Sequence, residues 1–132
     1  MTWKSHYITT FLTVYALTQS PSAAVCAMVG STFPDRIELI FLKKIHRTYS
    51  HWFVFYLPFF FLYKEGPSMY FFWFFMGALL HIVEDAFCGT IPILSPTKKV
   101  QVLPRLFYTG SVGEYVFVLL YCLFMMGIAN KV

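Results

Sequence analysis

The residues best suited to chemistry in this sequence are histidines and acids at the edges of apolar segments. The chain has only four histidines: His6, His46, His51 and His81. His81 and Asp85 are four residues apart, so in a helix they lie on one face, one turn apart, with Glu84 beside them. Ionisable groups inside an apolar segment are costly and usually face the protein interior, where they serve a function. We therefore expect a site at His81 and Asp85.

Neighbouring segments can bring further ligands to this site. His51 begins the apolar segment before the one that holds His81, and a tight turn, Lys64–Pro67, joins the two segments. The two are then antiparallel neighbours, which puts His51 and His81 at the same level. Asp35 and His46 lie in the loop that leads to His51. Imidazole and carboxylate ligands without thiolates suit zinc, manganese or iron, and do not form a closed structural zinc site.

Each of these groups also has a simpler interpretation. A histidine at the end of a membrane helix usually faces lipid headgroups. His46 and His51 are five residues apart, which is not one helix face, so His46 alone could be an ordinary loop residue. Glu84 and Asp85 could be exposed to water at a helix end.

The composition indicates that lipid is the solvent around these segments. Only 12% of the residues are charged and 58% are hydrophobic, with a mean hydropathy of +0.64. A soluble domain carries about a quarter charged residues, because its surface must be hydrated. Four apolar stretches stand out, at about residues 8–30, 49–63, 69–88 and 112–129. We predict one all-α integral membrane domain over residues 1–132, a polytopic bundle with three full spans.

The basic residues predict how the bundle is oriented. Seven of the ten lysines and arginines lie in two loops, residues 31–48 and 89–111. By the positive-inside rule these loops are cytoplasmic, and the Lys64–Pro67 turn lies on the opposite side. His51 and His81 would then lie near the cytoplasmic face. Membrane topology explains the positive charge. The sequence has no basic face with interleaved aromatic residues, so it does not predict nucleic-acid binding.

The first apolar stretch has two possible arrangements. A straight helix over residues 8–30 would be about 35 Å long and would leave His6 on the opposite side from Asp35. A metal-ligand role for His6 therefore requires the chain to double back near Gln19–Ser22, where Pro21 disfavours a continuous helix and a serine can cap a new one. Each half of this hairpin would be about 11 residues long. The alternative is one Pro-kinked fourth span.

Several motifs follow one another in a specific order. These are Gly30–Asp35 (GSTFPD), His46–His51 (HRTYSH), Gly77–Asp85 (GALLHIVED) and Gly89–Pro96 (GTIPILSP), with Thr109–Glu114 (TGSVGE) nearer the C-terminus. Their order resembles the bacterial membrane-bound, YdjM-like family of metal-dependent hydrolases over most of the chain. A histidine near the N-terminus, here His6, is also part of that resemblance. In the family the Pro-Asp is usually followed by another acid or histidine, whereas here Asp35 is followed by Arg36-Ile37-Glu38.

The resemblance implies hydrolysis of a membrane-associated ester, possibly a lipid phosphoester, at the bacterial inner membrane. The cofactor would be a divalent metal ion, zinc or manganese by preference. Its ligands would be His6, Asp35, His46, His51, His81 and Asp85. One of Glu84, Glu38 and Glu114 would act as general base, and Arg47 would stabilise an oxyanion or phosphate.

Two other functions remain open. A proton-coupled transporter would use His81 and Asp85 as a relay, but it needs polar groups across the whole bundle, and residues 53–63 and 69–75 offer almost none. A non-enzymatic assembly or anchoring subunit could keep the fold without turnover. The lipid bilayer is the one partner that the sequence predicts.

Overall fold

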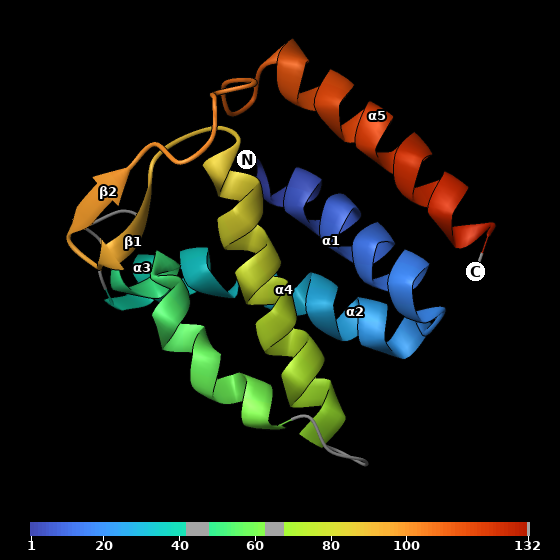
Figure 1. Ribbon diagram of the computed structural model, residues 1–132, viewed down its shortest axis with the longest axis horizontal. Helices are drawn as coiled ribbons and strands as arrows, with labels where there is room; N and C mark the ends of the chain where they lie inside the picture. The colour runs from blue at the N-terminus through green and yellow to red at the C-terminus, as the bar shows by residue number, and fades with distance from the viewer. Residues whose placement is uncertain (42–47, 63–67, 132) are drawn as a thin grey trace.

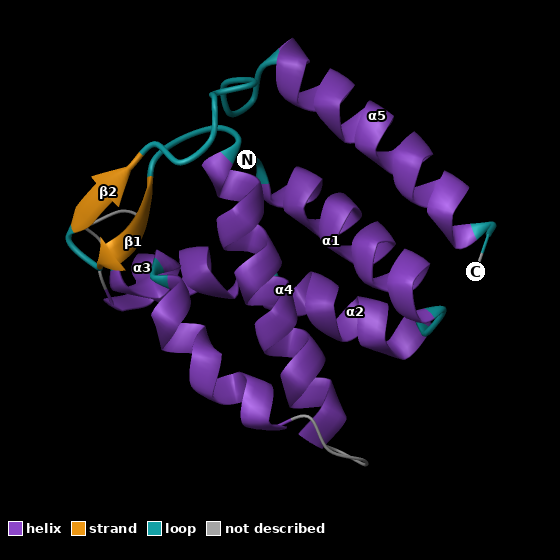
Figure 2. Cartoon of the chain, in the orientation of Figure 1, coloured by secondary structure: helices purple, strands orange, loops and turns teal. Residues whose placement is uncertain are grey.

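The computed structural model describes residues 1–41, 48–62 and 68–131, and most of them are helical (Figures 1 and 2). In chain order the elements are α1 (Trp3–Thr18), α2 (Pro21–Gly30), α3 (Phe33–Phe41), the 3₁₀ helices η1 (Tyr49–His51) and η2 (Phe53–Leu62), α4 (Ser68–Ala86), β1 (Ile91–Ser95), β2 (Lys98–Val100) and α5 (Val112–Ala129). The helical prediction is confirmed in its main part, and the two-stranded sheet corrects the expectation of an all-α chain.

The first apolar stretch doubles back as a helical hairpin. α1 ends at Thr18, and the next residue, Gln19, has a left-handed backbone with φ of 53°. Ser20 then caps α2, its hydroxyl accepting a hydrogen bond from the Ala23 amide, and Pro21 occupies the first helical turn. α1 and α2 pack against each other, so a single kinked helix is not what forms. α1 has 16 residues and α2 has 10, because α1 begins at Trp3 and not near residue 8 as predicted.

Helices α2 and α4 cross with their backbones in contact. A Cβ placed on Gly77 would lie 1.9 Å from the Ala27 carbonyl oxygen, and one placed on Gly30 would lie 1.8 Å from the Phe74 carbonyl oxygen. No side chain fits at either position, so glycine is required on both sides of the crossing. In Figure 1, α2 passes behind α4. This crossing fixes the N-terminal hairpin on the helix that carries His81.

The second apolar stretch is not the α-helix that the sequence predicted. It divides at Trp52 into η1 and η2, both of them 3₁₀ helices, and Pro58 lies inside η2. Proline has no amide donor and clashes with the carbonyl four residues earlier, which disfavours a regular α-helix here. Tertiary packing holds the segment instead. Phe59 stacks on Phe75 of α4, with ring centroids 3.6 Å apart, and the Tyr56 hydroxyl donates to the Ser50 carbonyl at 2.6 Å.

Both long loops contain structure that the sequence did not predict. α3 lies within residues 31–48, and β1 and β2 form an antiparallel hairpin within residues 89–111. The hairpin is held to the helices by the Trp52 indole, which donates to the Ile93 carbonyl at 2.9 Å. Ile91 and Pro92 are buried against the helices. In Figure 1, α3 and the two strands lie together on the side of α4 away from α5.

Among the described residues, α4 and α5 are the two helices long and apolar enough to cross a membrane. α5 leaves most of its large apolar side chains uncovered, Leu120 and Phe124 among them. At about 1.5 Å per residue, α1 is about 24 Å long and α2 about 15 Å, too short to cross the hydrocarbon core alone. The predicted count of three full spans therefore remains a prediction.

Candidate metal centre

Four elements bring five of the six predicted ligands together in the interior. They are His6 from α1, Asp35 from α3, His51 from η1, and His81 and Asp85 from α4. The three histidines are fully buried. His46 and Arg47, the remaining predicted ligand and the predicted phosphate-binding residue, lie outside the described residues. The cluster exists because the α1–α2 hairpin returns His6 to the carboxyl end of α4.

Four ligand atoms lie at the spacing of a small coordination shell. The Nε2 atoms of His51 and His81 are 3.1 Å apart. Asp35 Oδ1 lies 3.3 Å from the first and 3.5 Å from the second, and Asp85 Oδ2 lies 3.7 Å from each. Ligands around a tetrahedral ion with bonds of about 2.1 Å are themselves about 3.4 Å apart. These residues therefore fit a divalent ion of zinc type.

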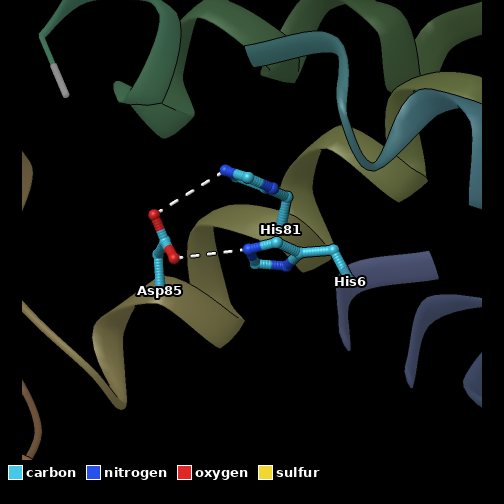
Figure 3. Close-up of side chains that lie close together, drawn as sticks. All are labelled: His6, His81 and Asp85. Carbon is cyan, nitrogen blue, oxygen red and sulfur yellow. Dashed lines mark ion pairs between the residues drawn. The ribbon is translucent and has the colours of Figure 1, made fainter. Parts of the chain in front are cut away.

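His6 extends the cluster on the other side of Asp85. Its Nε2 lies 3.4 Å from Asp85 Oδ1, while Asp85 Oδ2 faces His81 (Figure 3). The His6 and His81 rings lie close together, with centroids 3.9 Å apart and their planes tilted by 30°. His6, His81 and Asp85 form one group that could hold an ion, and Asp35, His51 and His81 form another. The amino group of Met1 also lies 2.5 Å from Asp85 Oδ1.

Two glutamates contact the outer nitrogens of the histidine rings. Glu84 Oε2 lies 2.5 Å from Nδ1 of His6, and Thr10 donates to the other oxygen of Glu84 at 3.3 Å. Glu38 Oε1 lies 3.0 Å from Nδ1 of His51 and accepts a hydrogen bond from the Ser50 hydroxyl at 2.5 Å. A carboxylate at Nδ1 makes that nitrogen the donor and leaves the Nε2 lone pair directed inward, as in metal-binding histidines.

Glu114 contacts the start of α1 and not the histidines. Its carboxylate accepts hydrogen bonds from the Thr2 amide at 2.7 Å, the Ser5 hydroxyl at 2.5 Å and the Gly110 amide at 2.6 Å. In the described part of the chain it makes no hydrogen bond to a histidine. Ser111 caps α5 in the same turn. Glu114 therefore joins the beginning of α5 to the beginning of α1, where it holds the turn that carries His6.

The electrostatics of the cluster favour positive charge at its centre. Among the residues that the structure describes, His6 Nε2, His81 Nδ1 and Asp35 Oδ1 are buried without a hydrogen-bond partner, which is costly unless something else satisfies them. Burial by itself would raise the pKa of Asp35, but the rings of His51 and His81 outweigh it and lower that pKa well below its ordinary value. Burial would likewise lower the pKa of His51, but Asp35 and Glu38 raise it overall.

Residues that the sequence did not single out surround Asp35. The Trp3 indole donates to Asp35 Oδ2 at 2.8 Å, and the Arg36 guanidinium lies over the Trp3 ring, 5.9 Å from its centroid. Arg36 also donates to the Tyr7 hydroxyl at 3.2 Å, so it is directed along α1. No sequence motif marks Trp3 or Tyr7, because only the α1–α2 hairpin places them beside α3.

Comparison with known proteins gives one match. The family model described as YdjM inner membrane protein matches residues 1–131. No curated protein and no solved structure matches the chain. The match covers every element that contributes to the cluster.

Proposed function

Since the chain belongs to the YdjM inner membrane protein family, we propose that it is a membrane-embedded metal-dependent hydrolase of a membrane-associated ester. The observation that supports this proposal is the pair of Nε2 atoms of His51 and His81, which lie 3.1 Å apart, each with Asp35 Oδ1 and Asp85 Oδ2 at 3.3–3.7 Å. Two ring nitrogens and two carboxylate oxygens at this spacing need a proton or a cation between them. The divalent ion would be zinc or manganese.

The buried glutamates act in this proposal as positioning residues. Glu84 holds the ring of His6, and Glu38 holds the ring of His51. We had predicted both, with Glu114, as candidates for the general base. Their hydrogen bonds to Nδ1, and the bonds of Glu114 to the first turn of α1, support a role in orienting ligands and elements instead.

Substrate and water reach the centre from the side of Asp35. The Asp35 side chain is 14% exposed, whereas the site histidines are fully buried and the Asp85 side chain is 3% exposed. A bound divalent ion would polarise the ester and lower the pKa of a coordinated water. In the hydrolysis the water oxygen bonds to the acyl or phosphoryl centre, the ester bond breaks, and the leaving alcohol takes up the proton that the water loses.

The proposed site lies at the cytoplasmic end of the bundle. The basic residues of the described loops are Arg36 in α3, Lys98 and Lys99 in β2, and Arg105 before α5, and α3 also carries Asp35 of the cluster, so in this proposal they mark one end of the bundle. By the positive-inside rule this end faces the cytoplasm. In this proposal α4, α5 and the segment that contains η2 form the three spans, and the α1–α2 hairpin packs among them from the cytoplasmic side.

Metal analysis of detergent-purified protein tests the proposal. Wild-type protein should bind at least one zinc or manganese ion, and His81→Ala should lose it together with hydrolysis of phosphate or carboxylate esters. Leu119→Ala, at an exposed position of α5, is the control and should keep both. Full metal occupancy in His81→Ala would place the site elsewhere. A metal-loaded wild type that hydrolyses neither ester class would favour the assembly or anchoring function.

A further inference from the structure

An apolar groove runs along the N-terminal hairpin beside the metal centre. It has a volume of about 420 Å³ and is lined by Tyr7, Ile8, Phe11 and Leu12 of α1 and Met28 of α2. Its size is in the range of small-molecule sites, about 300–1,000 Å³. Ile8 is 47% exposed, so the groove opens on the outer surface of the hairpin, where a membrane protein meets lipid chains. The lining offers hydrocarbon and aromatic rings to an occupant.

A chain of contacts leads from this groove to the metal centre. The hydroxyl of Tyr7, which lines the groove, accepts a hydrogen bond from Arg36 at 3.2 Å. The Arg36 guanidinium lies over Trp3, and the Trp3 indole donates to Asp35 at 2.8 Å. Arg36 is exposed, and no described carboxylate pairs with it. A cationic group therefore stands between an apolar groove and a candidate ligand of the ion.

We propose that this surface binds a lipid with a phosphate ester headgroup, its hydrocarbon chain in the groove and its phosphate on Arg36 and Tyr7. Guanidinium is the side chain best suited to phosphate, because it is always charged and donates in pairs. One part of this proposal rests on the proposed hydrolase function, namely that the bound lipid is the substrate and that its ester bond lies beside Asp35. The unusual Arg36 after Asp35 is then the residue that recognises the headgroup.

Lipid retention in native mass spectrometry tests this proposal on the full chain without requiring turnover. The probes are dioleoyl phosphatidic acid and dioleoylglycerol, which differ only in the phosphate. Ile8→Trp fills the groove, and Leu12→Trp is a second variant that fills it at another position. Arg36→Gln removes the guanidinium. The matched controls are Leu119→Trp, also exposed and apolar, and Arg105→Gln, whose guanidinium likewise lies over an aromatic ring, that of Tyr108.

Wild-type protein should prefer phosphatidic acid over dioleoylglycerol by about tenfold or more, the effect of a hydrogen bond to a charged group. Arg36→Gln should lose that preference, and the two groove variants should lower retention of both lipids. The proposal is overturned if both groove variants retain lipid as Leu119→Trp does, or if Arg36→Gln keeps the preference shown by Arg105→Gln. His81→Ala should retain lipid normally. Lipid retention that follows Arg36 in a protein without metal or turnover would contradict the hydrolase function alone.

Discussion

The glycine crossing of α2 and α4 allows a quantitative prediction for Gly77→Ala. The added Cβ would lie 1.9 Å from the Ala27 carbonyl oxygen, whereas 3.4 Å or more is ordinary contact. The two helices must therefore separate by about 1.5 Å, because the atom in the way is backbone and cannot rotate aside. Overpacking of this kind costs about 1–3 kcal/mol. The higher helix propensity of alanine returns about 1 kcal/mol, which leaves a net loss of about 0–2 kcal/mol, or about 1–3 kcal/mol relative to the same change at an open helical position.

The same displacement should reach the metal centre. α1 packs on α2 and carries His6, while α4 carries Asp85, whose Oδ1 lies 3.4 Å from His6 Nε2. A separation of about 1.5 Å would exceed the tolerance of about 0.5 Å within which a functional constellation must be held. We expect Gly77→Ala to bind metal at least about tenfold more weakly than wild type, in addition to its lower stability.

Unfolding of purified protein in mixed detergent micelles, followed by helical circular dichroism, measures the first effect, and metal titration measures the second. Gly127→Ala is the control, because it makes the same change in α5, where no described atom beyond the neighbouring backbone of α5 lies within 4 Å of the added Cβ. It should be neutral, or more stable by up to about 1 kcal/mol. A Gly77→Ala protein as stable as Gly127→Ala, with unchanged metal affinity, would refute the inference that α2 and α4 touch through their backbones.

Three further predictions concern the site and the topology. Glu84→Gln keeps the shape of the side chain but removes the charge at Nδ1 of His6, so metal affinity should fall about 10–100-fold while the melting temperature changes little; an unchanged affinity in metal titration would remove Glu84 from the site. Glu114→Ala removes the acceptor of the partly buried Thr2 amide and of the buried Ser5 hydroxyl, so thermal unfolding should show a loss of about 1–3 kcal/mol; a loss well below about 1 kcal/mol would contradict the role of Glu114 in holding the start of α1. Cysteine labelling should reach Lys98→Cys only from the cytoplasm and Lys64→Cys only from outside; labelling of Lys64→Cys from the cytoplasm alone would reverse the orientation.

The helices with local signals could be predicted closely from the sequence. Residues 112–129 are α5 as expected, because a serine cap precedes an uninterrupted apolar run. The hairpin at Pro21 is one of the two arrangements predicted for this stretch, from the missing proline amide and the neighbouring serine caps, and it is the one that forms. The convergence of His51 and His81 followed from the short turn between their segments. Each of these signals acts within a few residues, which a sequence displays directly.

Features that depend on distant partners could not be predicted in the same way. The segment with Pro58 forms 3₁₀ helix because it packs on Phe75, and β1 pairs with β2 although proline interrupts its alternation. The glutamates were recognised as important, but the direction of their side chains was not. Whether Glu38 faces the centre of the cluster or the outer nitrogen of a ring depends on how α3 meets η1, and no spacing in the sequence encodes that.

The bond between Glu114 and Thr2 joins residues 112 positions apart, and that between Glu84 and His6 joins residues 78 positions apart. During synthesis the first turn of α1 leaves the ribosome early and has neither partner until most of the chain has been translated. Contacts of such long range form late, because the loop between them must first be closed. A nascent chain that stops before residue 114 would therefore enter the membrane with its N-terminal turn unanchored. Glu114 of α5 can therefore fix the turn of α1 that carries His6 only after the other described helices have been synthesised.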